Sequence, residues 1–175
     1  MGGSEGSDDV SVNAGETAPG STVNVQDSGA DAADSDSVKV KAGSGNDRVT
    51  LSAAQILVGT TDPAAVGLDG VESVSVDGGE GFDSLAGPTV DSTWTIDGVN
   101  SGEVNSVAFQ SFEKLVGAAD NEDTFIVSDG GSLSGLMDGG AAGFDSLVID
   151  AGDYSVVTYT VIDEQSGYID LDGNV

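Results

Sequence analysis

The sequence predicts an all-β fold built from short strands, and three observations lead to this prediction. Apolar and polar residues alternate in short runs along the chain, which is the period of a strand with one buried face. Gly, Asp, Asn or Ser bounds each run, and these residues favour turns. Helical periodicity is nearly absent, and its best candidate, residues 52–58 (SAAQILV), is shorter than a helix that is stable alone.

The expected strands follow one another along the chain, separated by turns. Each contains two large apolar residues two positions apart, so that both side chains point to the same face of a sheet. In order, these pairs are Val10/Val12, Val23/Val25, Val38/Val40, Val49/Leu51, Val74/Val76, Trp94/Ile96, Phe125/Val127, Leu147/Ile149, Tyr159/Val161 and Ile169/Leu171. We expect Trp94 and Phe125, the aromatic rings of two of these pairs, to lie in the core.

The composition excludes several classes of function. The 175 residues include 31 Asp and Glu against 4 Lys and Arg, a net charge of -27, and neither His nor Cys is present. This rules out Ser-His-Asp triads, Cys nucleophiles, disulfides and ordinary zinc sites. Nucleic acid would meet like charge, and no apolar run is long enough for a membrane-spanning helix. We therefore expect no enzyme, no nucleic-acid partner and no membrane insertion.

Acidity alone does not predict disorder here. The hydrophobic fraction of 38% is high for a disordered acidic tail, so the chain should fold despite its self-repulsion.

Residues 1–4 (MGGS) are interpreted as an expression leader, and residues 5–175 as a single all-β repeat domain from a larger protein. Adaptation to high salt is an alternative explanation of the acidity.

Four segments repeat the same order of features, namely a Gly-rich turn, an Asp and an apolar strand. They are GSGNDRVTL (43–51), GGEGFDSLA (78–86), GAADNEDTFIV (117–127) and GGAAGFDSLVI (139–149). Their Asp residues lie 36, 40 and 22 residues apart, so the repeat is degenerate. A short repeat of this kind cannot bury its apolar face alone, and stacking of successive repeats would supply the core.

The segment GGEGFDSLA fits the nonapeptide G-G-x-G-x-D-x-U-x, in which U is a large apolar residue, at every fixed position. It resembles the calcium-binding nonapeptide of RTX proteins. The stretch 94–127 is similar to modules repeated in giant bacterial secreted and cell-surface proteins of the adhesin type. The resemblance implies a parallel β-solenoid or β-roll, with several Ca²⁺ ions between successive turns. An antiparallel β-sandwich is the alternative, because short strands allow it too.

The resemblance also implies which residues bind calcium. Ca²⁺ prefers carboxylate and carbonyl oxygens, and Gly lets a tight turn point its carbonyls inward. The metal-ligating candidates are Asp47, Asp83, Asp123 and Asp145, with Asp77, Asp120 and Asp138 completing the sites and Gly43, Gly78, Gly81, Gly139 and Gly143 shaping the turns. Ordinary β-turns without metal are the alternative interpretation of these segments.

These observations predict a Ca²⁺-stabilised structural or adhesive repeat domain of a secreted or cell-surface protein. Open solenoid ends favour end-to-end self-assembly into filaments, so the expected partners are calcium, further copies of the chain and surface glycans. The alternative is a carbohydrate-binding module that uses Trp94, or an accessory module of an extracellular polysaccharide-modifying enzyme. Lys39, Lys41 and Arg48 form a basic cluster that we expect to pair with neighbouring acidic turns.

Overall fold

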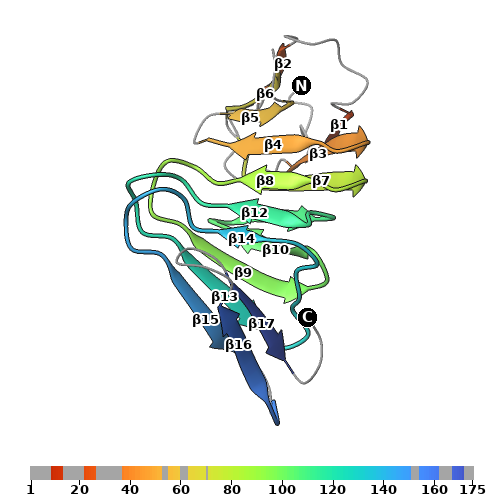
Figure 1. Cartoon of the computed structure of the whole chain (residues 1–175). Coiled ribbons are helices and arrows are strands. Elements are labelled where there is room, and N and C mark those ends of the chain that lie inside the picture. The colour runs from red at the N-terminus through yellow and green to blue at the C-terminus, as the bar shows by residue number, and fades with distance from the viewer. Residues whose placement is uncertain are drawn as a thin grey trace, which may run out of the picture.

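The computed structural model describes residues 9–13, 22–26, 37–52, 55–59, 63–69, 71–150, 154–161 and 167–171. These residues form strands and turns and contain no helix, so none of them forms a helix that could cross a membrane (Figure 1). The predicted all-β class is confirmed. Each of the apolar pairs expected in strands lies in a strand of the structure.

Two large sheets contain most of the described strands. The first sheet has eight strands in the order β1-β3-β7-β11-β10-β9-β13-β15. Their bounds are β1 Asp9–Asn13, β3 Ser37–Ser44, β7 Ser73–Glu80, β9 Thr93–Gly98, β10 Ser101–Val104, β11 Val107–Gln110, β13 Thr124–Ser128 and β15 Ser146–Asp150. The strand β11 pairs in parallel with β7, and β13 pairs in parallel with β9.

The second sheet has seven strands in the order β14-β12-β8-β4-β5-β6-β2. Their bounds are β2 Thr22–Gln26, β4 Arg48–Leu51, β5 Gln55–Val58, β6 Ala64–Asp69, β8 Ser84–Ala86, β12 Lys114–Val116 and β14 Met137–Asp138. A separate two-stranded sheet consists of β16 (Val157–Val161) and β17 (Gly167–Leu171). Parallel pairs dominate both large sheets, and the antiparallel pairs there occur within β4-β5-β6 and β9-β10-β11.

The chain crosses repeatedly from one large sheet to the other, and the crossings form two sets of stacked turns. We define the first turn column by the links β3–β4, β7–β8 and β11–β12, which are residues 45–47, 81–83 and 111–113. The second turn column consists of the links β8–β9, β12–β13 and β14–β15, which are residues 87–92, 117–123 and 139–145. In Figure 1 the loops of the second column lie one beneath another beside the sheets.

The segment 52–58, the best helix candidate in the sequence, forms a strand where the structure describes it. Residues 55–58 form β5, which pairs antiparallel with both β4 and β6, and residues 53–54 lie outside the described residues. Ile56 and Val58 point to the buried face of this strand. Burial of these alternating side chains overrides the helix propensity of the preceding Ala residues.

The core contains a cluster of aromatic side chains. Trp94 is 0% exposed, and its ring stacks on Phe125 at a centroid distance of 5.3 Å. Phe109 packs edge-on against Trp94 at 6.2 Å and also contacts Phe112. The expected core position of Trp94 is therefore confirmed. A carbohydrate platform that depends on an exposed Trp94 is contradicted, because the ring is enclosed.

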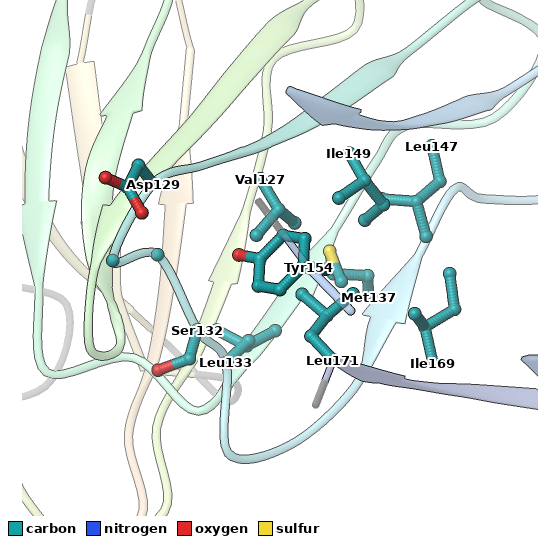
Figure 2. Close-up of a pocket in the computed structure, with 12 residues that line it drawn as sticks. Val127, Asp129, Ser132, Leu133, Met137, Leu147, Ile149, Tyr154, Ile169 and Leu171 are labelled. Atoms are coloured by element: carbon teal, nitrogen blue, oxygen red, sulfur yellow. The ribbon is translucent and has the colours of Figure 1, made fainter. Parts of the chain in front are cut away.

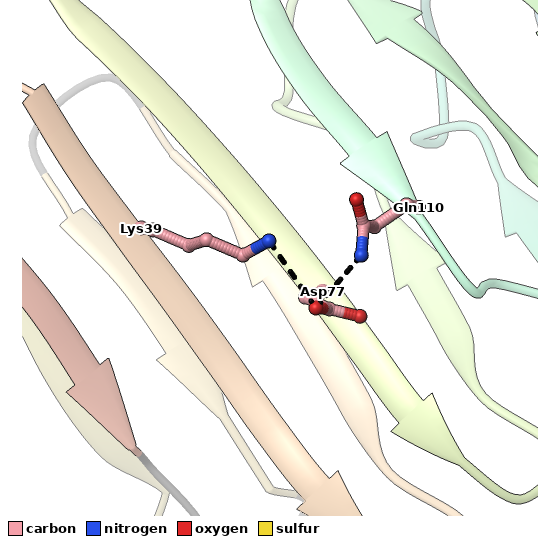
Figure 3. Close-up of polar contacts among 3 residues, drawn as sticks. All are labelled: Lys39, Asp77 and Gln110. Atoms are coloured by element: carbon pink, nitrogen blue, oxygen red, sulfur yellow. Dashed lines mark hydrogen bonds and ion pairs between the residues drawn. The ribbon is translucent and has the colours of Figure 1, made fainter.

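A polar chain crosses three strands of the first sheet (Figure 3). Lys39 Nζ on β3 lies 3.4 Å from Asp77 Oδ2 on β7, and Gln110 Nε2 on β11 donates to the same oxygen at 2.8 Å. Lys114 Nζ similarly lies 3.7 Å from Asp138 Oδ2. The expected pairing of Lys39 with a neighbouring acidic segment is confirmed. Such partly exposed ion pairs stabilise a fold by about 0–1 kcal/mol each.

Candidate functional site

The first turn column carries acidic residues at equivalent positions. Asp47, Asp83 and Glu113 each lie two residues before an apolar residue that points into the core. Those apolar residues pair in parallel register on β4, β8 and β12, and all are buried: Val49, Leu85 and Leu115. Because residues two positions apart on a strand point to the same face, this spacing directs the acid at the end of the turn toward the same buried side as the apolar residue.

Hydrogen bonds join the acids of the first column to one another. The backbone N–H of Asp47 donates to Asp83 Oδ1 at 2.7 Å, and the N–H of Asp83 donates to Glu113 Oε2 at 2.8 Å. In the reverse direction, the N–H of Ser84 donates to the Asp47 carbonyl at 2.9 Å, and that of Lys114 to the Asp83 carbonyl at 3.0 Å. Each pair of adjacent turns is therefore held by two hydrogen bonds, one of which ends on a carboxylate.

The second turn column repeats this arrangement. The N–H of Ser92 donates to Asp123 Oδ1 at 2.9 Å, and the N–H of Asp123 donates to Asp145 Oδ1 at 2.9 Å. The reverse bonds run from Thr124 N–H to the Ser92 carbonyl and from Ser146 N–H to the Asp123 carbonyl. We call this two-bond arrangement the carboxylate clamp, and it occurs four times in the described residues.

A further side chain strengthens one clamp in each column. Asn46 Oδ1 accepts the N–H of Phe82 at 3.0 Å, and Asp91 Oδ1 accepts the N–H of Glu122 at 2.9 Å. Both acceptors directly precede the clamp residue of their own turn. A carboxylate or amide at this position therefore satisfies a backbone donor that the next turn would otherwise leave without a partner.

Close stacking of the turns explains why glycine recurs in them. Gly81 has a φ of 136°, and a Cβ on it would overlap the carbonyl oxygen of Gly45 in the preceding turn. Gly143 in the second column has a φ of 88°, and its Cβ would overlap the carbonyl of Asn121. L-residues rarely adopt these φ values, and no side chain fits between the stacked turns.

Unpartnered carboxylate oxygens distinguish the first column from the second. Asp83 is 0% exposed, and the Oδ2 atoms of Asp83 and Asp47 are buried without a hydrogen-bond partner among the described residues. In the second column, Asp123 Oδ2 accepts the N–H of Ala118 at 3.0 Å. Both oxygens of Glu113 are also engaged, because Asn100 Nδ2 donates to its Oε1 at 2.9 Å. Among the described residues, the buried carboxylate oxygens without a hydrogen-bond partner therefore belong to Asp47 and Asp83.

Burial is the main cause of a raised carboxyl pKa at both of these residues. Burial raises the pKa of the Asp47 carboxyl above its ordinary value of 3.8. Burial also raises the pKa of Asp83, and the neighbouring carboxylates of Asp47, Glu113 and Asp77 raise it further. The hydrogen bond from the Asp47 backbone opposes this and lowers the pKa of Asp83. The net upward direction shows that burial and repulsion outweigh the hydrogen bond.

We predict that the protein without metal is more stable at mildly acidic pH than at pH 7. A carboxyl whose pKa is raised by folding binds protons more tightly in the folded state, so the free energy of unfolding falls as pH rises from 3.8 through the raised pKa. Urea unfolding in metal-free buffer between about pH 4.5 and 7.5 measures this slope. Asp47→Asn/Asp83→Asn should flatten it, and a wild-type stability that increases with pH would refute the assignment.

The sequence-predicted ligands do not gather at one point. Asp47 and Asp83 lie in the first column, with Gly43, Gly78 and Gly81 in or beside their turns. Asp123 and Asp145 lie in the second column, where Gly139 and Gly143 shape the last turn. Among the described residues, no group of three or more acidic side chains converges as a metal cluster. A cation in either column would therefore depend on backbone carbonyls as well as carboxylates.

The three remaining candidates make polar contacts of their own. Asp77 pairs with Lys39, and Asp138 pairs with Lys114 while accepting the N–H of Gly140. Asp120 is exposed and its N–H donates to the carbonyl of Ala141. Sequence reasoning missed Glu113 and Ser92 as clamp positions, because neither follows a Gly-rich turn. The signal that could have found Glu113 is the acid two residues before a large apolar residue, as in Asp83 and Leu85.

In comparisons with known proteins, no protein-family model, curated protein or solved structure matches the chain.

Proposed function

We propose that the chain is a Ca²⁺-stabilised structural or adhesive repeat domain of a secreted or cell-surface protein, wound as a β-solenoid. The carboxylate clamp carries this proposal, because it recurs in both turn columns. Its hydrogen bonds place acidic side chains in the contacts between successive layers. A protein built in this way extends by adding layers, and it needs cations to offset the charge that each layer brings.

The strand pairing supports a solenoid over an antiparallel sandwich. The chain alternates between the two large sheets, and most of its neighbouring strands run parallel. The strands β3 and β7, for example, pair in parallel over their whole length, with Val38 opposite Val74 and Gly43 opposite Gly79. An antiparallel sandwich would join neighbouring strands by hairpins instead.

Calcium fits the first column better than the second. Asp47 and Asp83 have buried oxygens without partners, and hard oxygen ligands are those that Ca²⁺ prefers. These two carboxylates, with carbonyls of the glycine turns beside them, are the residues that would hold the ion. Bound there, Ca²⁺ would neutralise the charge that raises the pKa of Asp83. The corresponding oxygen of Asp123 already accepts a backbone hydrogen bond, so the second column has less need of a cation.

The proposal is tested by thermal unfolding with and without calcium. We expect about 1 mM Ca²⁺ to raise the melting temperature above that in excess chelator by 5 °C or more, since a ligand that binds only the folded state stabilises it by mass action. Ionic strength is kept constant at about 0.15 M with NaCl, so that screening is equal in both samples. Equal melting temperatures would refute calcium stabilisation. A second series in excess chelator raises the NaCl concentration, and a melting temperature that NaCl alone restores would indicate adaptation to salt.

End-to-end association is part of the proposed function. Among the described strands, β15 is an edge of the first sheet and β14 an edge of the second, and edge strands offer unpaired backbone groups to another chain. We expect the scattering mass to increase with protein concentration in the presence of Ca²⁺. A mass that stays monomeric up to about 1 mM protein would remove self-assembly from the proposal and leave the calcium test unaffected.

A further inference from the structure

A cavity of about 600 Å³ lies at the C-terminal end of the core, between β15 and the hairpin β16–β17 (Figure 2). Small-molecule sites in proteins occupy about 300–1,000 Å³ and are mostly apolar with a few polar groups. Even an apolar cavity of about 150 Å³ can bind benzene. The size of this cavity therefore suits a small organic molecule.

The walls of the cavity are the inner faces of two strands. Leu147 and Ile149 lie on the same face of β15 and line the cavity, whereas Val148 between them is not part of the lining. Ile169 and Leu171 line it from β17 across the opening, as Figure 2 shows. The cavity therefore lies on the face of β15 that carries Ile149, which packs against the core cluster, while Leu147 at its open side is 43% exposed.

The hairpin covers this end of the core without belonging to either large sheet. Within the described residues, β16 and β17 pair only with each other. Leu171 nevertheless packs against the core cluster, as do Met137 and Ile149. The hairpin is therefore held against the core by side-chain contacts. Apolar side chains that face a space of this size lack the van der Waals contacts that close packing would give. A molecule that filled the space would restore those contacts.

The polar lining and the net charge restrict the class of ligand. Asp129, Ser132 and Tyr154 supply the polar side chains of the lining, and the protein carries a net charge of -27. An anionic head group beside Asp129 would be repelled, whereas a hydroxyl or an ammonium group could hydrogen-bond there. We propose that this cavity binds the aliphatic chain of a neutral or cationic amphiphile, with the polar head at Asp129 and Tyr154.

Binding is tested with octanol, octylammonium and octanoate, which share one chain and differ in the charge of the head group. Each is added below its aggregation concentration, and binding is followed by calorimetry and by chemical-shift changes of the Ile and Leu methyl groups. We expect saturable binding of octanol and octylammonium, and binding of octanoate at least tenfold weaker. Lack of saturable binding by all three, or equal binding of octanoate, would overturn the proposal.

Variants that fill the cavity assign the binding to this site. Ile149→Trp from β15 and Ile169→Trp from β17 should each weaken octanol binding at least tenfold. Val148→Trp is the matched control, because Val148 lies between Leu147 and Ile149 on β15 but outside the lining, and this variant should bind as the wild type does. Ile169→Trp decides the test if Ile149→Trp fails to fold. Unchanged binding in the filled variants would overturn the proposal.

Discussion

Replacing Gly81 with Ala should lower the free energy of unfolding by about 3 kcal/mol, which is a fall in melting temperature of about 6–12 °C for a chain of this length. The φ of 136° is strained for any L-residue, and the added Cβ would overlap the Gly45 carbonyl of the turn stacked on it. The two turns would have to separate, which would stretch the carboxylate clamp between Asp47 and Asp83. Urea unfolding measures the loss.

Gly45→Ala is the matched control for Gly81→Ala. Gly45 also has a positive φ, 106°, but a Cβ on it would meet no described atom within 4 Å. Gly45→Ala should therefore lower the free energy of unfolding only by the backbone strain, which is about 1 kcal/mol. The difference between the two variants therefore measures the stacking of successive turns. Equal losses would show that the turns are not in contact.

Asp83→Ala should destabilise the metal-free protein by about 2–3 kcal/mol relative to Asp83→Asn. Alanine leaves the N–H of Asp47 without its acceptor inside the turn column, whereas asparagine keeps an acceptor oxygen at that position. Asparagine also removes a buried charge that its neighbours repel, so Asp83→Asn should be at least as stable as the wild type at pH 7 without metal. Urea unfolding of the three proteins measures the order.

A substitution on the outer face of the first sheet serves as the control. Asp77→Ala removes the partly exposed ion pair with Lys39 and should cost within about 1 kcal/mol. If Asp83→Ala and Asp83→Asn were equally stable, the hydrogen bond to Asp47 would contribute nothing. If both Asp83 variants lost only as much free energy of unfolding as Asp77→Ala does, Asp83 would behave as an ordinary surface carboxylate.

The strands were predictable from the sequence because their signal is local. Pairs such as Val38/Val40 and Trp94/Ile96 show the two-residue period, and turn residues bound them on both sides. The strand β5 was not among those predicted, because Ala53 and Ala54 favour a helix locally, yet Ile56 and Val58 are buried on a strand that pairs with β4 and β6. Pairing with β4 and β6 makes this segment a strand, and a window of seven residues does not contain both partners.

The arrangement of the candidate site was less predictable, because it depends on which turns stack. Asp83 and Asp123 occupy similar motifs, yet the chain path places them in different columns. Between them, the antiparallel strands β9, β10 and β11 let Glu113, rather than the next repeated Asp, stack on Asp83. Register between distant strands is a property of the whole sheet, and repeat spacing alone does not fix it.

The carboxylate of Asp83 has two roles in the stack of turns. Its Oδ1 accepts the N–H of Asp47 and holds two turns together, while its Oδ2 is buried without a partner among the described residues. The first role stabilises the stack with or without metal, and the second makes the stack sensitive to cations and protons. Asp83 therefore holds successive turns together and also makes the stability of the stack depend on cations and pH.

Calorimetric titration of Ca²⁺ into the wild type, Asp83→Asn and Asp145→Asn shows whether calcium binds in the first turn column. Asparagine keeps the clamp acceptor in both variants, so a difference between them reports on cation binding rather than on folding. We predict saturable binding in the wild type, at least tenfold weaker binding in Asp83→Asn, and nearly unchanged binding in Asp145→Asn. Absence of binding in the wild type, or equal binding in the wild type and Asp83→Asn, would contradict a calcium site in the first turn column.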